Sequence, residues 1–211
     1  MRIRLSLSLL AGLAACASAP APKPTTTRSA ALAMSVRIVF PREGEYGRAT
    51  KVFFVRLEED SDPGMVGRLL DSKHVQGGIC YLLDAAPGRY AAVACAEKRN
   101  GWTRYAYFPR ELIEKTIVEV GPRGTASLGS CRLEVVGISA RGDDAQEHYR
   151  RLIEYDWSRV NLALQLFARK RFWVGRKFRY RRQDPDVAAA ARKHLVPAGY
   201  EPGPALPLAT D

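Results

Sequence analysis

The chain has 211 residues, 46% of them hydrophobic, and a formal net charge of +11. This length is enough for one good-sized domain with an appended element. No run of about 18 apolar residues follows the first part of the chain, which excludes a later membrane-spanning helix. The excess of Lys and Arg indicates anionic partners.

The N-terminus carries the most specific signal. Met1 to Arg4 is positively charged, and Leu5 to Leu13 is apolar but too short to span a bilayer. The sequence Leu-Ala-Ala-Cys, ending at Cys16, resembles the lipobox of bacterial lipoproteins. The resemblance implies that residues 1–15 are a signal peptide and that Cys16 receives a diacylglycerol before cleavage.

Two other interpretations of this segment are a cysteine buried in an apolar helix and an ordinary signal peptide cleaved near Ala19. The charge, the apolar length and the small residues before Cys16 favour lipidation instead. The family's sorting rule implies outer-membrane attachment facing the periplasm, because Ala17 is not an aspartate. The expected partners are the membrane, through the N-terminal lipid, and anionic envelope components or another envelope protein. Nucleic acid is not expected.

The next segment, 16–34, is predicted to be a flexible tether. Residues 17–33 lack aromatic side chains and are rich in Pro, Ala and Thr, a composition typical of extended or disordered linkers.

Residues 35–140 are predicted to form β-structure, with short apolar or alternating runs between turn residues. Pro87-Gly88 and Asn100-Gly101 are turn signals, and they predict a three-stranded meander between residues 79 and 108. The predicted strands lie at 35–40, 51–58, 79–84, 89–98, 102–108, 115–120 and 126–137.

Leu82 to Val93 resembles the hairpin of carboxypeptidase-regulatory-like and other prealbumin-like modules, in which Pro-Gly-x-Tyr joins two apolar strands. The resemblance implies a small non-catalytic sandwich. The predicted fold is therefore mainly β: an antiparallel β-sandwich of about seven strands, prealbumin-like or Ig-like, with C-terminal α-helices packed on it.

The predicted extension at 141–200 is helical and basic-aromatic. Apolar residues from Tyr149 to Phe167 recur at helical spacing, which indicates one helix or two. Asp184 before Pro185 predicts the start of a further helix that runs to Leu195. Residues 201–211 are predicted to be a loose tail.

Three cysteines follow the proposed anchor. In an oxidising compartment, a two-residue turn at Pro87-Gly88 would pair Cys80 with Cys95, whereas a four-residue loop would separate them. A Cys95–Cys131 bridge competes, and so does the interpretation that all three are small buried hydrophobic residues. No metal site is predicted, since CxxC is absent and the histidines are far apart.

A basic-aromatic segment is the best candidate for a functional surface, with Phe178 and Tyr180 alternating with cations. It could bind an anionic surface. Alternatively, its aromatic side chains pack on the domain and its cations are merely solvated, which is the favoured interpretation. Its basic residues are Arg169, Lys170, Arg171, Arg176, Lys177, Arg179, Arg181 and Arg182.

The sequence predicts no catalytic site and no cofactor. Ser127 and Ser130 do not lie in a Gly-x-Ser-x-Gly motif, and no glycine-rich phosphate loop occurs. Acidic residues 58–62 and the Arg-Gly-Asp at 141–143 are interpreted as turns, and His148 as a helix-surface partner of Asp144. The expected function is a non-catalytic binding or scaffolding module. The alternative is an envelope enzyme of hydrolase type whose site assembles only in three dimensions.

Overall fold

The computed structural model describes residues 20–41, 46–57, 69–137, 149–150 and 170–203. Its helices are α1 (Arg110–Lys115) and α4 (Pro185–Leu195). Its strands are β1 (Ala30–Val39), β2 (Tyr46–Arg48), β3 (Lys51–Leu57), β4 (Leu69–Asp71), β5 (His74–Gln76), β6 (Ile79–Ala85), β7 (Gly88–Arg99), β8 (Trp102–Tyr107), β9 (Val118–Val120), β10 (Thr125–Gly137) and β11 (Lys170–Arg181).

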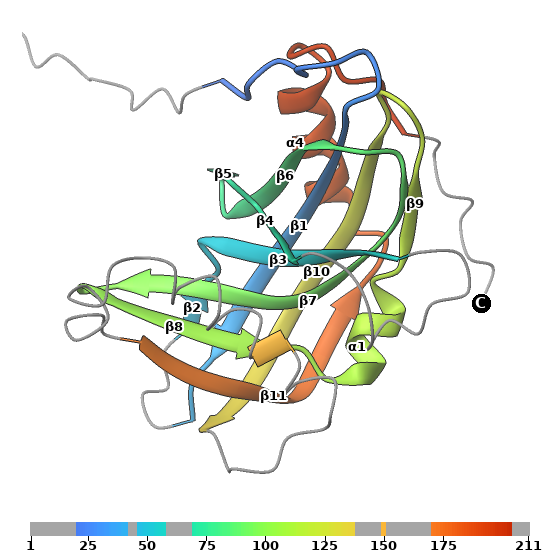
Figure 1. The fold of residues 1–211 in the computed structure, drawn as a ribbon. Helices are drawn as coiled ribbons and strands as arrows, with labels where there is room; N and C mark the ends of the chain where they lie inside the picture. The colour runs from blue at the N-terminus through green and yellow to red at the C-terminus, as the bar shows by residue number, and fades with distance from the viewer. Residues whose placement is uncertain (1–19, 42–45, 58–68, 138–148, 151–169, 204–211) are drawn as a thin grey trace, which may run out of the picture.

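The fold is mainly β, as predicted, but it is not an antiparallel sandwich of about seven strands. The described strands form one 11-stranded mixed sheet in the order β4-β3-β7-β8-β11-β10-β1-β6-β5. Strand β2 adds to β1, and β9 adds to β7. The sheet curls, so that β3, β7 and β8 lie across β1 and β10 in Figure 1.

Two parallel pairings distinguish this sheet from a sandwich of hairpins. Strand β1 runs parallel to β10, and β11 runs parallel to β8. Strand β11 therefore lies in the middle of the sheet and is not part of a separate extension at 141–200. The alternating sequence predicted strands, but a parallel pair joins segments that are far apart in the chain, and no local pattern encodes it.

One of the two predicted turns forms a hairpin. Asn100 and Gly101 both have positive φ, of 48° and 76°, and the flanking Arg99 and Trp102 pair across β7 and β8. This is the geometry that Asn-Gly favours in a two-residue hairpin loop.

The other predicted hairpin is wrong. Strand β6 pairs with β1 and β5, whereas β7 pairs with β3, β8 and β9. Pro87-Gly88 therefore lies in a connection between two parts of the sheet, and the predicted three-stranded meander is reduced to β7 and β8. The hairpin on which the prealbumin-like resemblance depended does not form.

Two predicted boundaries also change. Strand β1 begins at Ala30, not at residue 35, and Ala30–Ala33 are fully buried, so the end of the predicted tether belongs to the sheet. The predicted strand at 115–120 is shortened to β9, because α1 runs to Lys115 and buries Leu112 and Ile113.

The concave side of the sheet encloses the main hydrophobic core. Side chains such as Met34, Val52, Cys95 and Leu133 come from four different strands and are fully buried there. Burial of apolar area, at about 25 cal/mol per Å², is the main stabilising contribution.

A buried ion pair lies beside this core. Glu97 and Arg104 face each other across β7 and β8, with Arg104 Nε 2.8 Å from Glu97 Oε2, and both side chains are less than a tenth exposed. The Arg104 guanidinium also lies 3.8 Å from the Phe40 ring centroid. A Cβ on Gly47 would come within 2.5 Å of the Glu97 carboxylate, so a larger residue there would have to displace that carboxylate.

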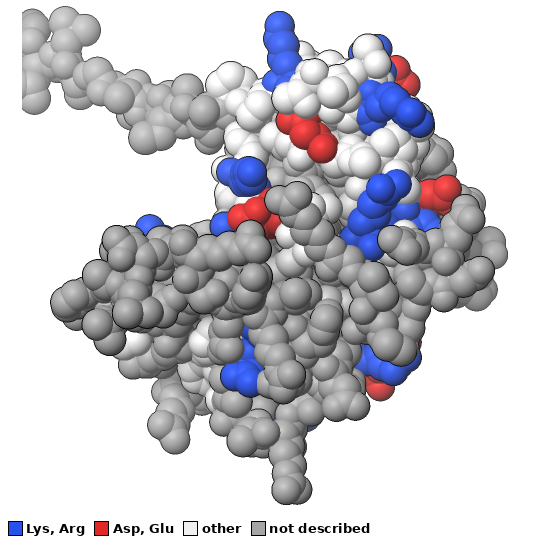
Figure 2. All heavy atoms as spheres, viewed as in Figure 1, with Lys and Arg blue, Asp and Glu red and all other residues white. Residues whose placement is uncertain are grey.

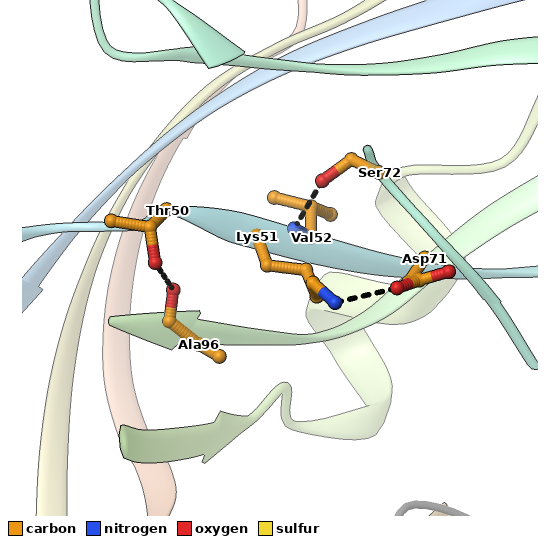
Figure 3. Close-up of polar contacts among 6 residues, drawn as sticks. All are labelled: Thr50, Lys51, Val52, Asp71, Ser72 and Ala96. Carbon is orange, nitrogen blue, oxygen red and sulfur yellow. Dashed lines mark hydrogen bonds and ion pairs between the residues drawn. The ribbon is translucent and has the colours of Figure 1, made fainter. Parts of the chain in front are cut away.

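Polar contacts hold the start of β3 between its neighbours (Figure 3). Thr50 Oγ1 donates to the carbonyl oxygen of Ala96, and Lys51 Nζ lies 2.5 Å from Asp71 Oδ2. The Val52 amide donates to Ser72 Oγ at 2.8 Å. Ser72 is almost fully buried, so this bond satisfies a polar group inside the fold.

Helix α4 begins where the sequence predicts. Asp184 caps it by accepting from the amides of Asp186 and Val187, and Pro185 occupies the first turn. The helix packs its buried Val187, Ala191 and Leu195 on a second, smaller core. The helices predicted between Tyr149 and Phe167 lie outside the described residues except at residues 149–150.

Candidate functional site

An arginine row crosses four neighbouring strands on the convex side of the sheet. Arg48 on β2 pairs in register with Arg37 on β1, Arg37 pairs with Arg132 on β10, and Arg132 pairs with Arg179 on β11. Residues directly opposite one another in a sheet project from the same face. At about 4.8 Å per strand, the row spans roughly 14 Å.

The arginine row is accessible and lacks carboxylate partners. Arg37, Arg48 and Arg179 are exposed, and Arg132 is half-buried. Among the described residues, none of the four forms an ion pair with a carboxylate. Within the described part of the chain, no carboxylate neutralises the row.

Arg132 is held in place by the exposed ring of Tyr46. Its guanidinium lies 4.9 Å from the ring centroid, and its Nη2 donates to the tyrosine hydroxyl at 3.0 Å. Tyr46 itself is 60% exposed. Arg132 Nε is buried and has no hydrogen-bond partner among the residues that the structure describes. A buried donor without a partner is unfavourable, so this arginine is held at a cost in stability.

Further cations flank the row along β11. Lys177 pairs with Glu134, and Arg181 pairs with Ser130, so both lie on the same face as Arg179. Glu134, opposite Lys177, is the one acidic residue among these register pairs. We define the basic face as the arginine row together with its two flanking cations. Its residues are Arg37, Arg48, Arg132, Lys177, Arg179 and Arg181.

The alternation predicted for the basic-aromatic segment is present in β11. Phe178 and Tyr180 pack against the main core, and Tyr180 donates to the carbonyl oxygen of Leu128 at 2.9 Å. The intervening Lys177, Arg179 and Arg181 are exposed. The aromatic half of the favoured interpretation therefore holds, while the cations join a larger basic face.

The other predicted basic residues are not all in this face. Arg176 lies at a register shift between β10 and β11, and Arg182 follows the strand. Lys170 and Arg171 belong to β11, but their side chains are not among those described. Arg169 and the proposed lipidation site Cys16 lie outside the described residues.

Glycine at position 129 brings β11 close to β10. Gly129 has a φ of 72°, and a Cβ there would come within 1.9 Å of the Arg181 carbonyl oxygen. Gly129 lies at a register shift between β1 and β10. Ala33 of β1 pairs with Ser127, but Ser35, two residues later, pairs with Ser130, so β10 has one extra residue here. The shift keeps Arg132 opposite Arg37 and so helps to build the arginine row.

The three cysteines downstream of the proposed anchor are free and buried. Burial raises the pKa of the Cys80 and Cys131 thiols to about 12 and raises that of Cys95 well above its ordinary value, with smaller contributions from the other thiols at Cys95. Neutral thiols are poor nucleophiles. The predicted Cys80–Cys95 bridge loses its structural basis, because β6 and β7 are not neighbours.

Of the remaining candidates from the sequence, Ser130 lies among the described residues and has a structural contact. Ser130 Oγ donates to Asp184 Oδ2 at 2.5 Å and supports the cap of α4. Residues 58–62, the Arg-Gly-Asp and His148 lie outside the described residues. Within the described ranges, no group of His, Cys, Asp or Glu could hold a metal ion, and no helix is long and apolar enough to cross a membrane.

A pocket of about 470 Å³ lies apart from the arginine row, between α4, β9 and the start of β10. The charged residues at its walls are Glu119, Arg182, Asp184 and Arg192. Figure 2 shows that basic and acidic side chains are intermixed on the face seen there.

Comparisons with protein-family models, with curated proteins and with solved structures gave no match to this chain.

Three arginines of the row, Arg37, Arg48 and Arg132, were not among the predicted site residues. The signal for two of them was present in the sequence. Arg37 and Arg132 occupy polar positions in the alternating runs at 35–40 and 126–137, which places them on the solvent face of a strand. What the alternation could not predict was the register that aligns them.

Proposed function

We propose that this protein is a lipid-anchored, non-catalytic module of the cell envelope whose basic face docks on an anionic phospholipid surface. The arginine row is the observation that carries the proposal. The lipobox resemblance at Cys16 supports the anchor.

The chemistry of the row suits phosphate. Each guanidinium presents planar donors that match two phosphate oxygens, and such bonds are stronger than neutral ones. Arg132 is positioned for such binding, because the Tyr46 ring and hydroxyl hold its guanidinium.

The shape and position of the basic face favour a membrane over a small ligand. The cations are spread across four strands of the sheet. Tyr46 stands exposed at one end of the row, and tyrosine is enriched where proteins meet lipid headgroups. Near an anionic surface each cation contributes about 1 kcal/mol. Six cations would therefore add substantially to an N-terminal lipid.

Vesicle binding tests the basic face. The full chain with Cys16→Ala, which has no lipid, is mixed with vesicles of phosphatidylcholine alone or containing phosphatidylglycerol. Arg37→Ser, Arg48→Ser, Arg132→Ser and Arg179→Ser are then combined. At about 1 kcal/mol per cation, we expect binding to the anionic vesicles to weaken by roughly a hundredfold or more.

A matched control removes the same charge elsewhere. Lys73, Lys98, Lys115 and Lys193 are exposed residues outside the basic face, and changing all four to Ser should weaken binding far less. Equal loss in both variants would contradict docking through the arginine row. So would binding of the Cys16→Ala protein to an anionic polysaccharide or an envelope protein, with none to the anionic vesicles.

Fractionation tests the anchor separately. Salt at about 1 M reduces the screening length to about 3 Å and should release a protein held only by surface charge. After a salt wash of cell membranes, the unchanged protein should remain bound and the Cys16→Ala variant should be released. Retention of that variant would argue against lipidation at Cys16.

A further inference from the structure

The pocket beside α4 has walls that the fold holds in place. One wall is α4 from its capped start to Arg192, and another is the beginning of β10. The chain after α4 closes a third side, since the Gly203 amide donates to Thr125 Oγ1 at 2.9 Å and the Glu201 amide to the Arg123 carbonyl oxygen at 2.7 Å. Its volume, about 470 Å³, is within the usual range of small-molecule sites, roughly 300–1,000 Å³.

Much of the wall is apolar, and two of its polar residues, Thr125 and Asp184, already accept hydrogen bonds from the protein itself. The apolar residues are Val118, Ala126, Pro185, Ala188, Ala191 and Pro202. Thr125 accepts from Gly203, and both oxygens of Asp184 accept hydrogen bonds, from Ser130 and from two amides of α4. Glu119 is exposed and lies in register opposite Arg89 across β7 and β9, but the two side chains form no ion pair among the described residues.

Two guanidinium groups of the wall are not occupied in this way. Arg182 donates one bond, from Nη2 to the carbonyl oxygen of Ile117 at 3.0 Å. A guanidinium carries five N–H donors, so most of its capacity is left for a ligand. Neither Arg182 nor Arg192 forms an ion pair with any described residue. The pocket thus combines an apolar wall with two cations that form no ion pair with a described carboxylate.

We propose that this pocket binds a small amphiphile with one anionic head and a short alkyl chain, such as a medium-chain fatty acid. Arg182 and Arg192 bind the head, and the apolar wall along α4 and β10 covers the chain. The inference is independent of docking through the basic face, since the pocket shares no residue with that face.

Calorimetric titration with decanoate tests the pocket in the full-length protein. Each methylene from octanoate to decanoate should tighten binding by up to about fourfold, because one buried methylene is worth about 0.8 kcal/mol. Decanol carries the chain without the charge and acetate the charge without the chain, so both should bind much more weakly. Equal binding of decanol, or no binding of decanoate, would overturn the proposal.

Paired variants locate the site. Ala188→Phe should fill the pocket and abolish decanoate binding, whereas Ala189→Phe, exposed on the same helix and outside the pocket, should leave binding unchanged. Arg192→Gln should weaken decanoate at least tenfold, with Lys193→Gln as the charge control. Circular dichroism checks that each variant folds. If each control weakens binding as much as its partner, the ligand lies elsewhere.

The four-serine variant of the arginine row separates the two proposals. It should bind decanoate as the unchanged protein does, even if its vesicle binding is lost. Loss of decanoate binding in this variant would show that the acid binds the basic face instead of the pocket.

Discussion

Strands β1 and β10 present two different outer surfaces along their length. Near the start of the strands, Ala31 and Ala33 are fully buried in the small core that contains α4. Further along the same side, Arg37 and Arg132 belong to the basic face. In both parts every second residue points to this outer side. The size of these residues decides whether a helix packs on the strand or solvent contacts it. Alanine lets a helix approach the sheet closely, whereas a row of arginines keeps the sheet in contact with solvent.

The largest effect on stability should come from placing an arginine in the part of β1 that α4 covers. Ala33→Arg places a cation under α4 without a carboxylate partner among the residues of the small core. A buried charge without a partner costs about 3–5 kcal/mol. Denaturant unfolding should show a loss of this size, and a loss below about 1 kcal/mol would mean that α4 does not cover this position tightly.

Removing apolar contact from α4 should have the next largest effect. Leu195→Ala deletes a fully buried side chain and should lower the free energy of unfolding by about 2–5 kcal/mol. Val196→Ala is the control, because Val196 is 38% exposed and should change stability by less than about 1 kcal/mol. Similar losses for the two variants would contradict the described packing of the helix.

The cap of α4 should contribute less and should depend on pH. Burial disfavours ionisation of Asp184, but hydrogen bonds from Ser130, Val187 and Asp186, with the charge of Arg181, outweigh it and lower the pKa below its ordinary 3.8. Asp184→Ala should therefore cost about 1 kcal/mol near neutral pH.

Linkage gives the sign of that pH dependence. A lowered folded-state pKa stabilises the protein above the ordinary pKa of 3.8, and this contribution is lost as pH falls through the folded-state value. The difference in unfolding free energy between the unchanged protein and Asp184→Ala should shrink below about pH 4. A difference that grows on acidification would mean that the carboxyl is not stabilised as an anion.

The smallest effect on stability should come from a substitution in the basic face, which α4 does not cover. Arg37→Ala removes an exposed side chain and should change the free energy of unfolding by no more than about 0.5 kcal/mol. A clear loss of stability would mean that the arginine row serves packing, and a gain would indicate that its like charges repel one another in the folded state.

The sequence predicted features that depend on neighbours in the chain. Asn100-Gly101 and the Asp184-Pro185 cap form as expected, because turn and cap geometry arise within a few residues. Pro87-Gly88 is an equally local signal, but a turn becomes a hairpin only if the flanking strands pair, and β6 and β7 each have better partners elsewhere in the sheet.

The candidate site was predictable only in part for the same reason. Alternation placed Lys177, Arg179 and Arg181 on one side of a strand, and the structure agrees. The arginine row needs four strands to meet in one register, two of them parallel, and no spacing within one segment encodes that. The pocket depends in the same way on β9, β10 and α4 meeting.

The parallel pairing of β1 with β10 has a consequence for the order of folding. Ala31, at the beginning of the sheet, pairs with Thr125 far later in the chain. Strand β1 is synthesised first, but it can pair with β10 only after more than half of the chain has been synthesised. Contacts so distant in sequence slow folding, because loop closure comes before any pairing energy. A chain whose first strand pairs this late stays extended longer while it is being synthesised.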